Sequence, residues 1–169
     1  MAHVTLILGG ARSGKSARAL ALAPAPHVLI ATAEPLDAEM AERIRLHQAE
    51  RGPDWGLVEA PLDLAAAIRA NAGEGTTLLI DCLTLWLSNL IHHKRDIGEE
   101  TAALADALTE APGRVVLVSN ELGIGLAPIN ALGRSFRDEQ GRLNQRIAAV
   151  ADHAEFIVAG LPIVLKGAP

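Results

Sequence analysis

The sequence predicts one α/β domain in which helices cover a mostly parallel sheet, and three observations support this prediction. Half of the 169 residues are hydrophobic, which is enough for one substantial core. Short uncharged apolar runs alternate with segments of helical periodicity. Aromatic residues make up only 2%, so Ala, Leu, Ile and Val must fill the buried strands. We therefore expect a single domain that spans residues 1–169.

The first apolar run, Val4 to Leu8, leads directly into a glycine-rich loop that reads G-x-x-x-x-G-K-S. The loop consists of Gly9, Gly10, Ala11, Arg12, Ser13, Gly14, Lys15 and Ser16. Its glycines allow successive backbone N–H groups to face phosphate oxygens, and the following helix adds a partial positive charge. In such a loop Lys15 reaches the β- and γ-phosphates and Ser16 reaches a Mg²⁺ ion. The pattern predicts a nucleotide site between a strand and a helix over residues 17–22.

A second buried strand is predicted within residues 26–33, ending near Thr32. Ligands of open α/β sheets lie outside the carboxyl ends of the strands, so residues 32–34 should border the same nucleotide. The pattern becomes helical over residues 37–51, with His47 at the edge of the inward face. His47 is either a partly buried histidine packed on the sheet or an imidazole held near the phosphates as a nucleophile or acid–base group. Spacing alone does not choose between these two.

Residues 55–60 form a short connection with some strand character, and a helix is expected over residues 61–70. Glu59 is the acidic group of that connection. It is either a solvated loop carboxylate or a hydrogen-bond acceptor for a base or ribose.

An apolar strand over residues 76–81 ends in Asp81, the position at which proteins with such loops hold the Mg²⁺ shell. A helix over residues 83–91 follows. Cys82 lies inside the apolar segment and is expected to be a buried thiol, and Trp86 is expected in the core.

The last third of the chain predicts two more helices and three more strands. The helices cover residues 99–110 and 130–151, and the strands cover residues 114–121, 154–160 and 162–166. The last two strands are joined by so short a turn that they must be antiparallel. Residues 92–95 resemble a polar helix end rather than a metal site. The polar side chains of the last helix either form a solvated face or reach phosphates or a neighbouring subunit; they are Arg134, Arg137, Asp138, Arg142, Asn144, Gln145 and Arg146.

Charge and hydropathy exclude several classes of protein. A net charge of −5 provides no basic surface for nucleic acid. The longest apolar region, residues 78–91, is interrupted by polar groups and does not predict a membrane span. No basic segment followed by an apolar stretch precedes the glycine-rich loop, so a secretory signal is not expected. One cysteine cannot form an internal disulfide. A cytoplasmic enzyme fits these features.

Taken together, the motifs closely resemble those of the bifunctional adenosylcobinamide kinase / adenosylcobinamide-phosphate guanylyltransferase family of cobalamin biosynthesis. The resemblance runs from the glycine-rich loop through Ala31-Thr32-Ala33, Asp37-Ala38-Glu39-Met40, Arg43-Ile44, His47, Trp55, Glu59, Val118-Ser119-Asn120-Glu121, Gly123-Ile124-Gly125, Arg134-Ser135-Phe136-Arg137-Asp138, Gly141, Asn144-Gln145 and Gly160-Leu161-Pro162 to Lys166. It also implies a three-layer P-loop NTPase fold of the RecA type and a propeller-like homotrimer with sites between subunits.

The resemblance implies two successive reactions. Adenosylcobinamide is phosphorylated by ATP or GTP, and GMP is then transferred from GTP through a guanylylated histidine, giving adenosyl-GDP-cobinamide and pyrophosphate. His47 matches the family's nucleophile and Lys15 is the second catalytic residue. The nucleotide contacts correspond to the loop, Ala31, Thr32, Ala33, Gln48, Ala49, Glu50, Arg51, Glu59 and Asp81, with Ser16 and Asp81 for Mg²⁺.

Some relatives carry Glu at position 81, so the role of Asp81 toward metal or guanine stays open. Two other functions remain to be compared with this one. A simple small-molecule kinase would leave His47 unmodified and release only ADP or GDP. A nucleotide-driven assembly or switch protein would need a partner surface, and the chain has no further interaction module.

Overall fold

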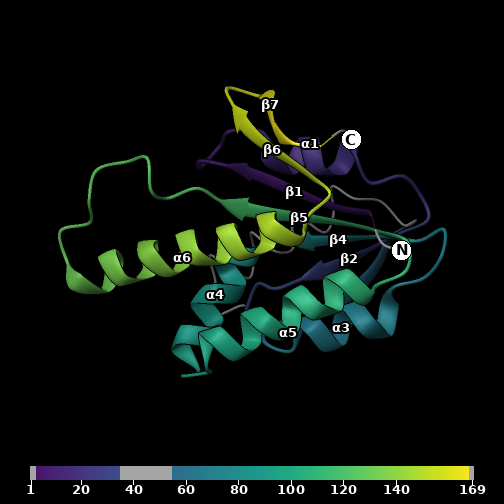
Figure 1. The fold of residues 1–169 in the computed structure, drawn as a ribbon, viewed down its shortest axis with the longest axis horizontal. Helices are drawn as coiled ribbons and strands as arrows, with labels where there is room; N and C mark the ends of the chain where they lie inside the picture. Colours follow the sequence, from purple (N-terminus) through teal and green to yellow (C-terminus); the bar gives the residue numbers. More distant parts are fainter. Residues whose placement is uncertain (1–2, 35–54, 168–169) are drawn as a thin grey trace.

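The computed structural model describes residues 3–34 and 55–167, which form a seven-stranded sheet in the order β3-β2-β4-β5-β1-β6-β7 (Figure 1). The strands are β1 (His3–Gly9), β2 (His27–Ala31), β3 (Trp55–Glu59), β4 (Thr77–Asp81), β5 (Arg114–Asn120), β6 (His153–Val158) and β7 (Leu161–Lys166). The neighbouring strands from β3 to β6 pair in parallel, and β7 pairs antiparallel to β6. The predicted mostly parallel sheet with an antiparallel C-terminal edge is confirmed.

The described helices cover both faces of this sheet. They are α1 (Lys15–Ala21), α3 (Leu64–Asn71), α4 (Leu83–His92), α5 (Ile97–Glu110) and α6 (Ala131–Val150). Alternation along β1 divides its side chains, since Leu6 and Leu8 pack with the cluster beneath α3 to α6 while Ile7 packs with Ala19 of α1. Strands buried on both faces read as continuous apolar runs, which is why the sequence predicted them.

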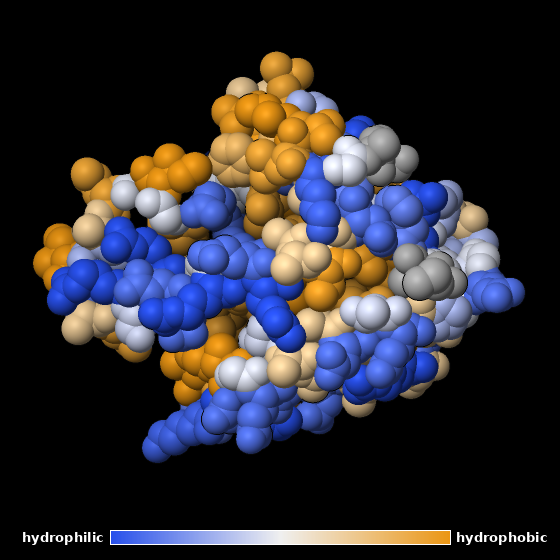
Figure 2. All heavy atoms as spheres, in the orientation of Figure 1, coloured by the Kyte–Doolittle hydropathy of each residue, from blue (hydrophilic) through white to orange (hydrophobic). Residues whose placement is uncertain are grey.

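Burial falls from the middle of the sheet to its edge. Residues 4–9 of β1 are all buried, whereas every residue of β7 is exposed. In the space-filling view, apolar atoms of the β7 hairpin form the top of the molecule (Figure 2). The trace between β5 and α6, residues 121–130, reaches out beyond the sheet (Figure 1).

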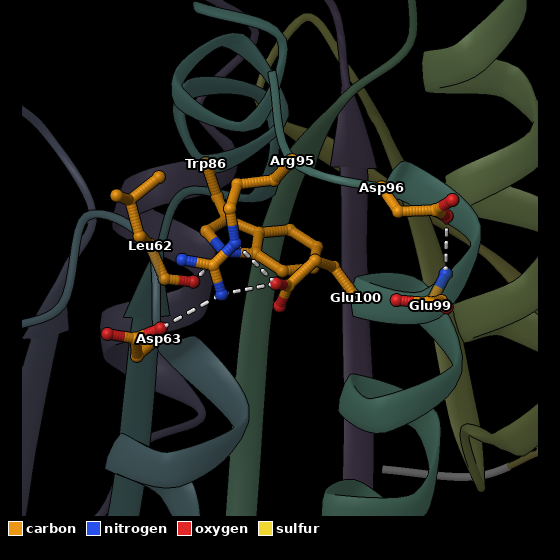
Figure 3. Close-up of polar contacts among 7 residues, drawn as sticks. All are labelled: Leu62, Asp63, Trp86, Arg95, Asp96, Glu99 and Glu100. Carbon is orange, nitrogen blue, oxygen red and sulfur yellow. Dashed lines mark hydrogen bonds and ion pairs between the residues drawn. The ribbon is translucent and has the colours of Figure 1, made fainter. Parts of the chain in front are cut away.

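Polar side-chain contacts connect α3, α4 and α5 where these helices meet (Figure 3). Asp96 caps α5, its Oδ1 accepting a hydrogen bond from the Glu99 N–H at 2.9 Å, so this helix starts at Ile97 rather than at residue 99. The Trp86 indole N–H donates to the Leu62 carbonyl at 2.8 Å, and its side chain is fully buried, as predicted.

Figure 3 also shows the Arg95 guanidinium between the carboxylates of Asp63 and Glu100, with 3.1 Å from Nη2 to the Asp63 Oδ1. Helix α3 begins at Leu64 instead of residue 61, with Asp63 at its N-cap position. Residues 64–71 therefore form a shorter helix than predicted.

The segment expected as a connection with some strand character at residues 55–60 forms a full edge strand, β3. Gly56 and Leu57 of this strand are exposed. An edge strand lacks the continuous buried apolar run of its neighbours, so its sequence gives a weaker strand signal. The helix predicted over residues 37–51 lies outside the described residues. None of the helices that the described residues form combines the length and apolar content of a membrane span.

Candidate nucleotide-binding site

The glycine-rich loop connects β1 to α1, which is the strand–loop–helix arrangement that the sequence predicted. Gly14 has a φ of +96°, in the left-handed region that side chains disfavour. A Cβ at this position would also lie 3.1 Å from the Gly160 Cα in the turn between β6 and β7. The Gly160 N–H donates to the Ser13 carbonyl at 2.8 Å, so this turn packs directly on the loop.

Lys15 is the first residue of α1, and its Nζ donates to the Gly10 carbonyl at 2.9 Å across the loop. Burial lowers the pKa of Lys15, and the nearby Cys82 and Asp81 act in the opposite direction. A half-buried ammonium is poorly hydrated, so phosphate oxygens in the loop would supply hydrogen bonds that water does not. Burial also raises the pKa of Cys82, which keeps this buried thiol protonated, as expected for a core cysteine.

Three of the predicted site residues lie level with one another at the carboxyl edge of the sheet. Ala31 of β2 is in register with Asp81 of β4 on one side and with Glu59 of β3 on the other. Neighbouring strands lie about 4.8 Å apart, which places Glu59 and Asp81 roughly 10 Å from each other along this edge. Through β5, Asp81 is level with Ile7, two residues before the loop begins.

Thr32 is fully buried, and its polar groups are occupied within the protein. Its hydroxyl donates to the Cys82 carbonyl at 2.7 Å and accepts from the Cys82 N–H at 2.9 Å. Its own N–H donates to the Asp81 carbonyl at 3.2 Å. Thr32 therefore joins the end of β2 to the end of β4, while Ala31 and Ala33 beside it are half-buried.

Ser16 in the first turn of α1 and Asp81 at the end of β4 supply a hydroxyl and a carboxylate oxygen. Mg²⁺ prefers oxygen ligands and usually takes one or two from the protein, with phosphates and waters completing its shell. Within residues 3–34 and 55–167, no group of three or more His, Cys, Asp or Glu side chains forms a protein-only metal centre. This donor set fits a Mg²⁺ ion that arrives with a nucleotide.

An ionic cluster, which we define as Arg18, His153 and Glu155, anchors α1 to the sheet. The Arg18 guanidinium donates twice to the Glu155 carboxylate, each time at 2.7 Å, and Glu155 is buried. The His153 Nε2 lies 2.9 Å from the Glu155 Oε1, and its ring is also buried. The hydrogen bonds from Arg18 hold the pKa of Glu155 below its usual range. The sequence does not predict this cluster, because nothing in the local pattern links residues 137 positions apart.

An amide cluster, which we define as Ser119, Gln140 and Asn144, is buried between the end of β5 and α6. The Ser119 hydroxyl donates to the Asn144 Oδ1 at 2.6 Å, and the Gln140 Nε2 donates to Ser119 and Asn144 at 2.9 and 3.0 Å. The Asn144 Nδ2 donates to the Asn120 carbonyl at 3.0 Å. The expectation that Asn144 belongs to a solvated or ligand-reaching face is wrong, because this side chain is buried beneath α6.

The end of β5 also contacts the loop itself. The Glu121 N–H donates to the Gly9 carbonyl at 3.0 Å, and the Asn120 N–H donates to the Thr84 hydroxyl of α4 at 2.9 Å. Of the other polar residues of α6 named above, Arg137 is half-buried and the rest are exposed: Arg134, Asp138, Arg142, Gln145 and Arg146. Exposure fits both a solvated face and contact with phosphates or a neighbouring subunit, so both stay predictions.

The described residues place the glycine-rich loop, residues 31–33, Glu59 and Asp81 along the carboxyl edge of the sheet. Glu59 lies farthest from the loop, because β2, β4 and β5 lie between β3 and β1. His47 and the predicted contacts Gln48, Ala49, Glu50 and Arg51 lie outside the described residues. Glu34 is the last described residue before that segment, and its Oε1 lies 3.0 Å from the His93 Nε2 at the end of α4.

The sequence was compared with known families and proteins. A family described as "Cobinamide kinase / cobinamide phosphate guanyltransferase" matches residues 5–165. The Bifunctional adenosylcobalamin biosynthesis protein CobP of Pseudomonas aeruginosa is 48% identical over 169 residues, which cover 97% of this chain and 98% of that protein. The Bifunctional adenosylcobalamin biosynthesis protein CobU of Salmonella typhimurium is 40% identical, covering 95% of this chain and 98% of that protein.

Two solved structures with a similar fold share little sequence with this chain. A Pyrococcus horikoshii protein aligns with a TM-score of 0.57 at 8% identity, covering 99% of this chain and 87% of its own. The P4 protein of bacteriophage phi6, solved in complex with ADP, aligns with a TM-score of 0.50 at 18% identity, covering 95% of this chain and 54% of its own. These likenesses identify the P-loop NTPase fold alone.

Proposed function

This chain belongs to the cobinamide kinase / cobinamide phosphate guanyltransferase family, and from that membership we propose that it catalyses two successive steps of cobalamin biosynthesis. In the first step, adenosylcobinamide is phosphorylated with ATP or GTP. In the second, GMP is transferred from GTP to the new phosphate, giving adenosyl-GDP-cobinamide and pyrophosphate. The observation that carries the proposal is the family match over nearly the whole chain. The strand–loop–helix arrangement that leads to Lys15 supports it.

The phosphates bind in the loop of residues 9–16, at the N-terminus of α1. Lys15 holds the terminal phosphates, and their negative charge compensates the burial of its ammonium. For the kinase step, the substrate hydroxyl oxygen bonds to the γ-phosphorus as the bond to the bridging oxygen breaks. The hydroxyl proton leaves, and ADP or GDP is released. This chemistry depends mainly on positioning and on neutralising charge around the transferred group.

Ser16 and Asp81 are the residues that would hold Mg²⁺ beside the phosphates. When bound, this ion supplies positive charge that stabilises developing charge on the phosphate oxygens. Asp81 lies near enough to Lys15 for its charge to raise the pKa of that lysine, against the effect of burial.

We assign the guanylyl transfer to His47. A neutral ring nitrogen attacks the α-phosphorus of GTP, the bond to the bridging oxygen breaks, and pyrophosphate leaves. A phosphate oxygen of adenosylcobinamide phosphate then attacks the same phosphorus, breaks the P–N bond and restores the imidazole. Base and ribose contacts come from Ala31, Ala33, Glu59 and residues 48–51. Thr32 acts by shaping this edge, since its hydroxyl and N–H are bonded within the protein.

We further propose that the protein is a cytoplasmic homotrimer with sites between subunits. Two groups of exposed apolar residues support an association surface (Figure 2). One group is Leu161, Ile163, Val164 and Leu165 of β7, and the other is Ile124, Leu126 and Ile129 between β5 and α6 with Leu132 in the first turn of α6. Sedimentation equilibrium should give a mass of three chains. A monomer at micromolar concentration would contradict this part of the proposal.

Product analysis separates the proposed function from a simple kinase. The protein is incubated with adenosylcobinamide, GTP and Mg²⁺, and the products are resolved by liquid chromatography with mass detection. We expect adenosyl-GDP-cobinamide and pyrophosphate in equal amounts, with the cobinamide phosphate as an earlier intermediate. GDP as the sole nucleotide product, with the reaction stopping at the phosphate, would leave only kinase activity.

A further inference from the structure

Helix α4 carries a buried amide among the apolar residues of its inward face. Asn89 is 5% exposed, and Leu87 and Leu90 beside it are fully buried core residues. Its Nδ2 donates to the Thr32 carbonyl at 2.7 Å and to the Pro61 carbonyl at 2.9 Å. Because both N–H groups of the amide are used, this one side chain connects α4 to the chain just after β2 and just after β3.

The contact with Thr32 reaches the proposed phosphate site through a short series of hydrogen bonds. Thr32 holds both the N–H and the carbonyl of Cys82 with its hydroxyl, and its N–H donates to the Asp81 carbonyl. The backbone on either side of the Asp81–Cys82 peptide is therefore fixed by Thr32. Asn89 in turn fixes Thr32 through the carbonyl of that residue.

One helical turn beyond Asn89, the same helix makes a second contact with the end of β2. The His93 Nε2 lies 3.0 and 3.2 Å from the two carboxylate oxygens of Glu34. Residues four apart face the same side of a helix, so Asn89 and His93 hold residues 32 and 34 from one surface of α4. We call residues 32–34 the β2 exit.

We propose that Asn89 and His93 are positioning residues of the enzyme, which fix the β2 exit and, through Thr32, the placement of Asp81 relative to the phosphate-binding loop. This inference rests on the proposed function, because it assigns the two residues to that same site. Neither side chain needs to touch the nucleotide. Their effect is on the geometry of groups that do, and misplacement by about 1 Å can lower a rate by about 100-fold.

The Asn89→Leu variant tests this inference, since it keeps the approximate volume of the side chain but removes both donors. We expect the Kd for GTP with Mg²⁺, measured by titration calorimetry, to rise about tenfold, and kcat for the cobinamide product to fall by about 10- to 100-fold. Ser88→Ala on the exposed neighbouring position should leave both values within twofold of the parent.

A matched control separates positioning from general destabilisation. Leu108 is fully buried near the end of α5, which leads to the amino end of β5 and so lies away from the site. Leu108→Ala should lower the melting temperature without changing the Kd or kcat at temperatures well below that melting temperature. If Asn89→Leu changes only its melting temperature, as Leu108→Ala does, Asn89 is a purely structural residue and the inference is overturned.

His93→Ala provides a second test that does not depend on a buried substitution, because this side chain lies on the surface. We expect a twofold to fivefold loss of kcat/KM, of the order of an exposed ion pair. His92→Ala is the control: His92 packs edge to face on His93 but is not bonded to Glu34 in any contact of the described residues. Equal activities for the two variants would contradict a role for His93.

Assays of the parent protein distinguish a failure of the positioning role from a failure of the proposed function. If the parent makes neither cobinamide product, the proposed function fails. The calorimetric comparison of Asn89→Leu with Leu108→Ala still decides the positioning role toward GTP. If the parent is active and Asn89→Leu matches it in Kd and kcat, the positioning role alone fails.

Discussion

The ionic cluster and the amide cluster lie on opposite faces of the sheet and on either side of β1, the strand that leads into the glycine-rich loop. Glu155 is in register with Ile7, and Ser119 is in register with Leu8. The ionic cluster holds α1, which begins with Lys15, by charged hydrogen bonds. The amide cluster holds the end of β5, which contacts Gly9, by neutral ones. One strand is thus supported by two chemistries that respond differently to pH and to substitution.

The difference matters because a buried charge and a buried amide destabilise the fold by different amounts when they lose a partner. A buried carboxylate that loses its partner is strongly destabilising, whereas a neutral group that loses one costs less. A carboxylate can also be protonated, which an amide cannot. The contribution of the ionic cluster to the free energy of unfolding therefore depends on pH, and that of the amide cluster does not.

The largest effect is expected at Lys15, the residue that both clusters help to place. Lys15→Met should lower turnover by about 100-fold or more, because it removes the charge held against the terminal phosphates. The free energy of unfolding should not fall, since burial of this ammonium already lowers its pKa. Steady-state assays and urea unfolding measure the two. Lys94→Met on the exposed surface is the control, and equal turnover for both variants would contradict the role of Lys15.

The ionic cluster should dominate stability. Arg18→Met is expected to lower the free energy of unfolding by about 2–4 kcal/mol, because it leaves the buried Glu155 without its guanidinium partner. Arg142→Met serves as the matched control, since this exposed arginine contacts only the surface carboxylate of Glu139 among the described residues. Urea unfolding of both variants at neutral pH measures the difference. If Arg18→Met lowered the free energy of unfolding by less than about 1 kcal/mol, the Arg18–Glu155 pair would contribute no more than an ordinary surface ion pair.

The pH dependence of unfolding should distinguish the two clusters directly. The pKa of Glu155 is held low by Arg18, so its contribution is fully present above the ordinary glutamate pKa of about 4.3. It is lost as the pH falls through the lowered pKa of the folded protein, because the unfolded chain binds the proton more readily. Glu155→Gln should flatten this acidic part of the profile. Unfolding midpoints measured from neutral pH to about pH 3 would test this, and an unchanged slope would contradict it.

The amide cluster should show a smaller effect that is independent of pH. Ser119→Ala removes one hydroxyl from the cluster and is expected to cost about 1–2 kcal/mol at each pH tested. Ser135→Ala on the exposed surface of α6 is the control and should lie within about 0.5 kcal/mol of the parent. A cost that grows toward acid would show that the two clusters are not separable.

The sequence predicted those parts of the site that local pattern determines. The loop motif and the apolar run that ends at Asp81 both have short-range signals, and the structure places them at the same edge of the sheet. The strand order that brings Glu59 level with Asp81 has no such signal, since β2 lies between strands that are consecutive along the chain. The start of α5 was missed although Asp96 and Glu99 form a recognisable capping pair.

The contacts that support the site were harder to predict from the sequence than the site itself. Arg18 and Glu155 are 137 positions apart, and Asn89 and Thr32 are 57 positions apart. Each of these residues is common on protein surfaces, and only the packing of α1 and α4 on the sheet makes them buried partners. Asn144 was grouped with the polar residues that form a solvated face or reach phosphates or a neighbouring subunit, whereas the helix turns its side chain inward.

The central claim, guanylyl transfer through His47, is tested most directly by intact-mass spectrometry after incubation with GTP and Mg²⁺, beside a His47→Ala variant. We predict a covalent adduct of one GMP on the parent and none on the variant, with the adduct lost when cobinamide phosphate is added. A parent that binds and turns over GTP but remains unmodified would contradict the histidine mechanism and leave the protein a simple kinase.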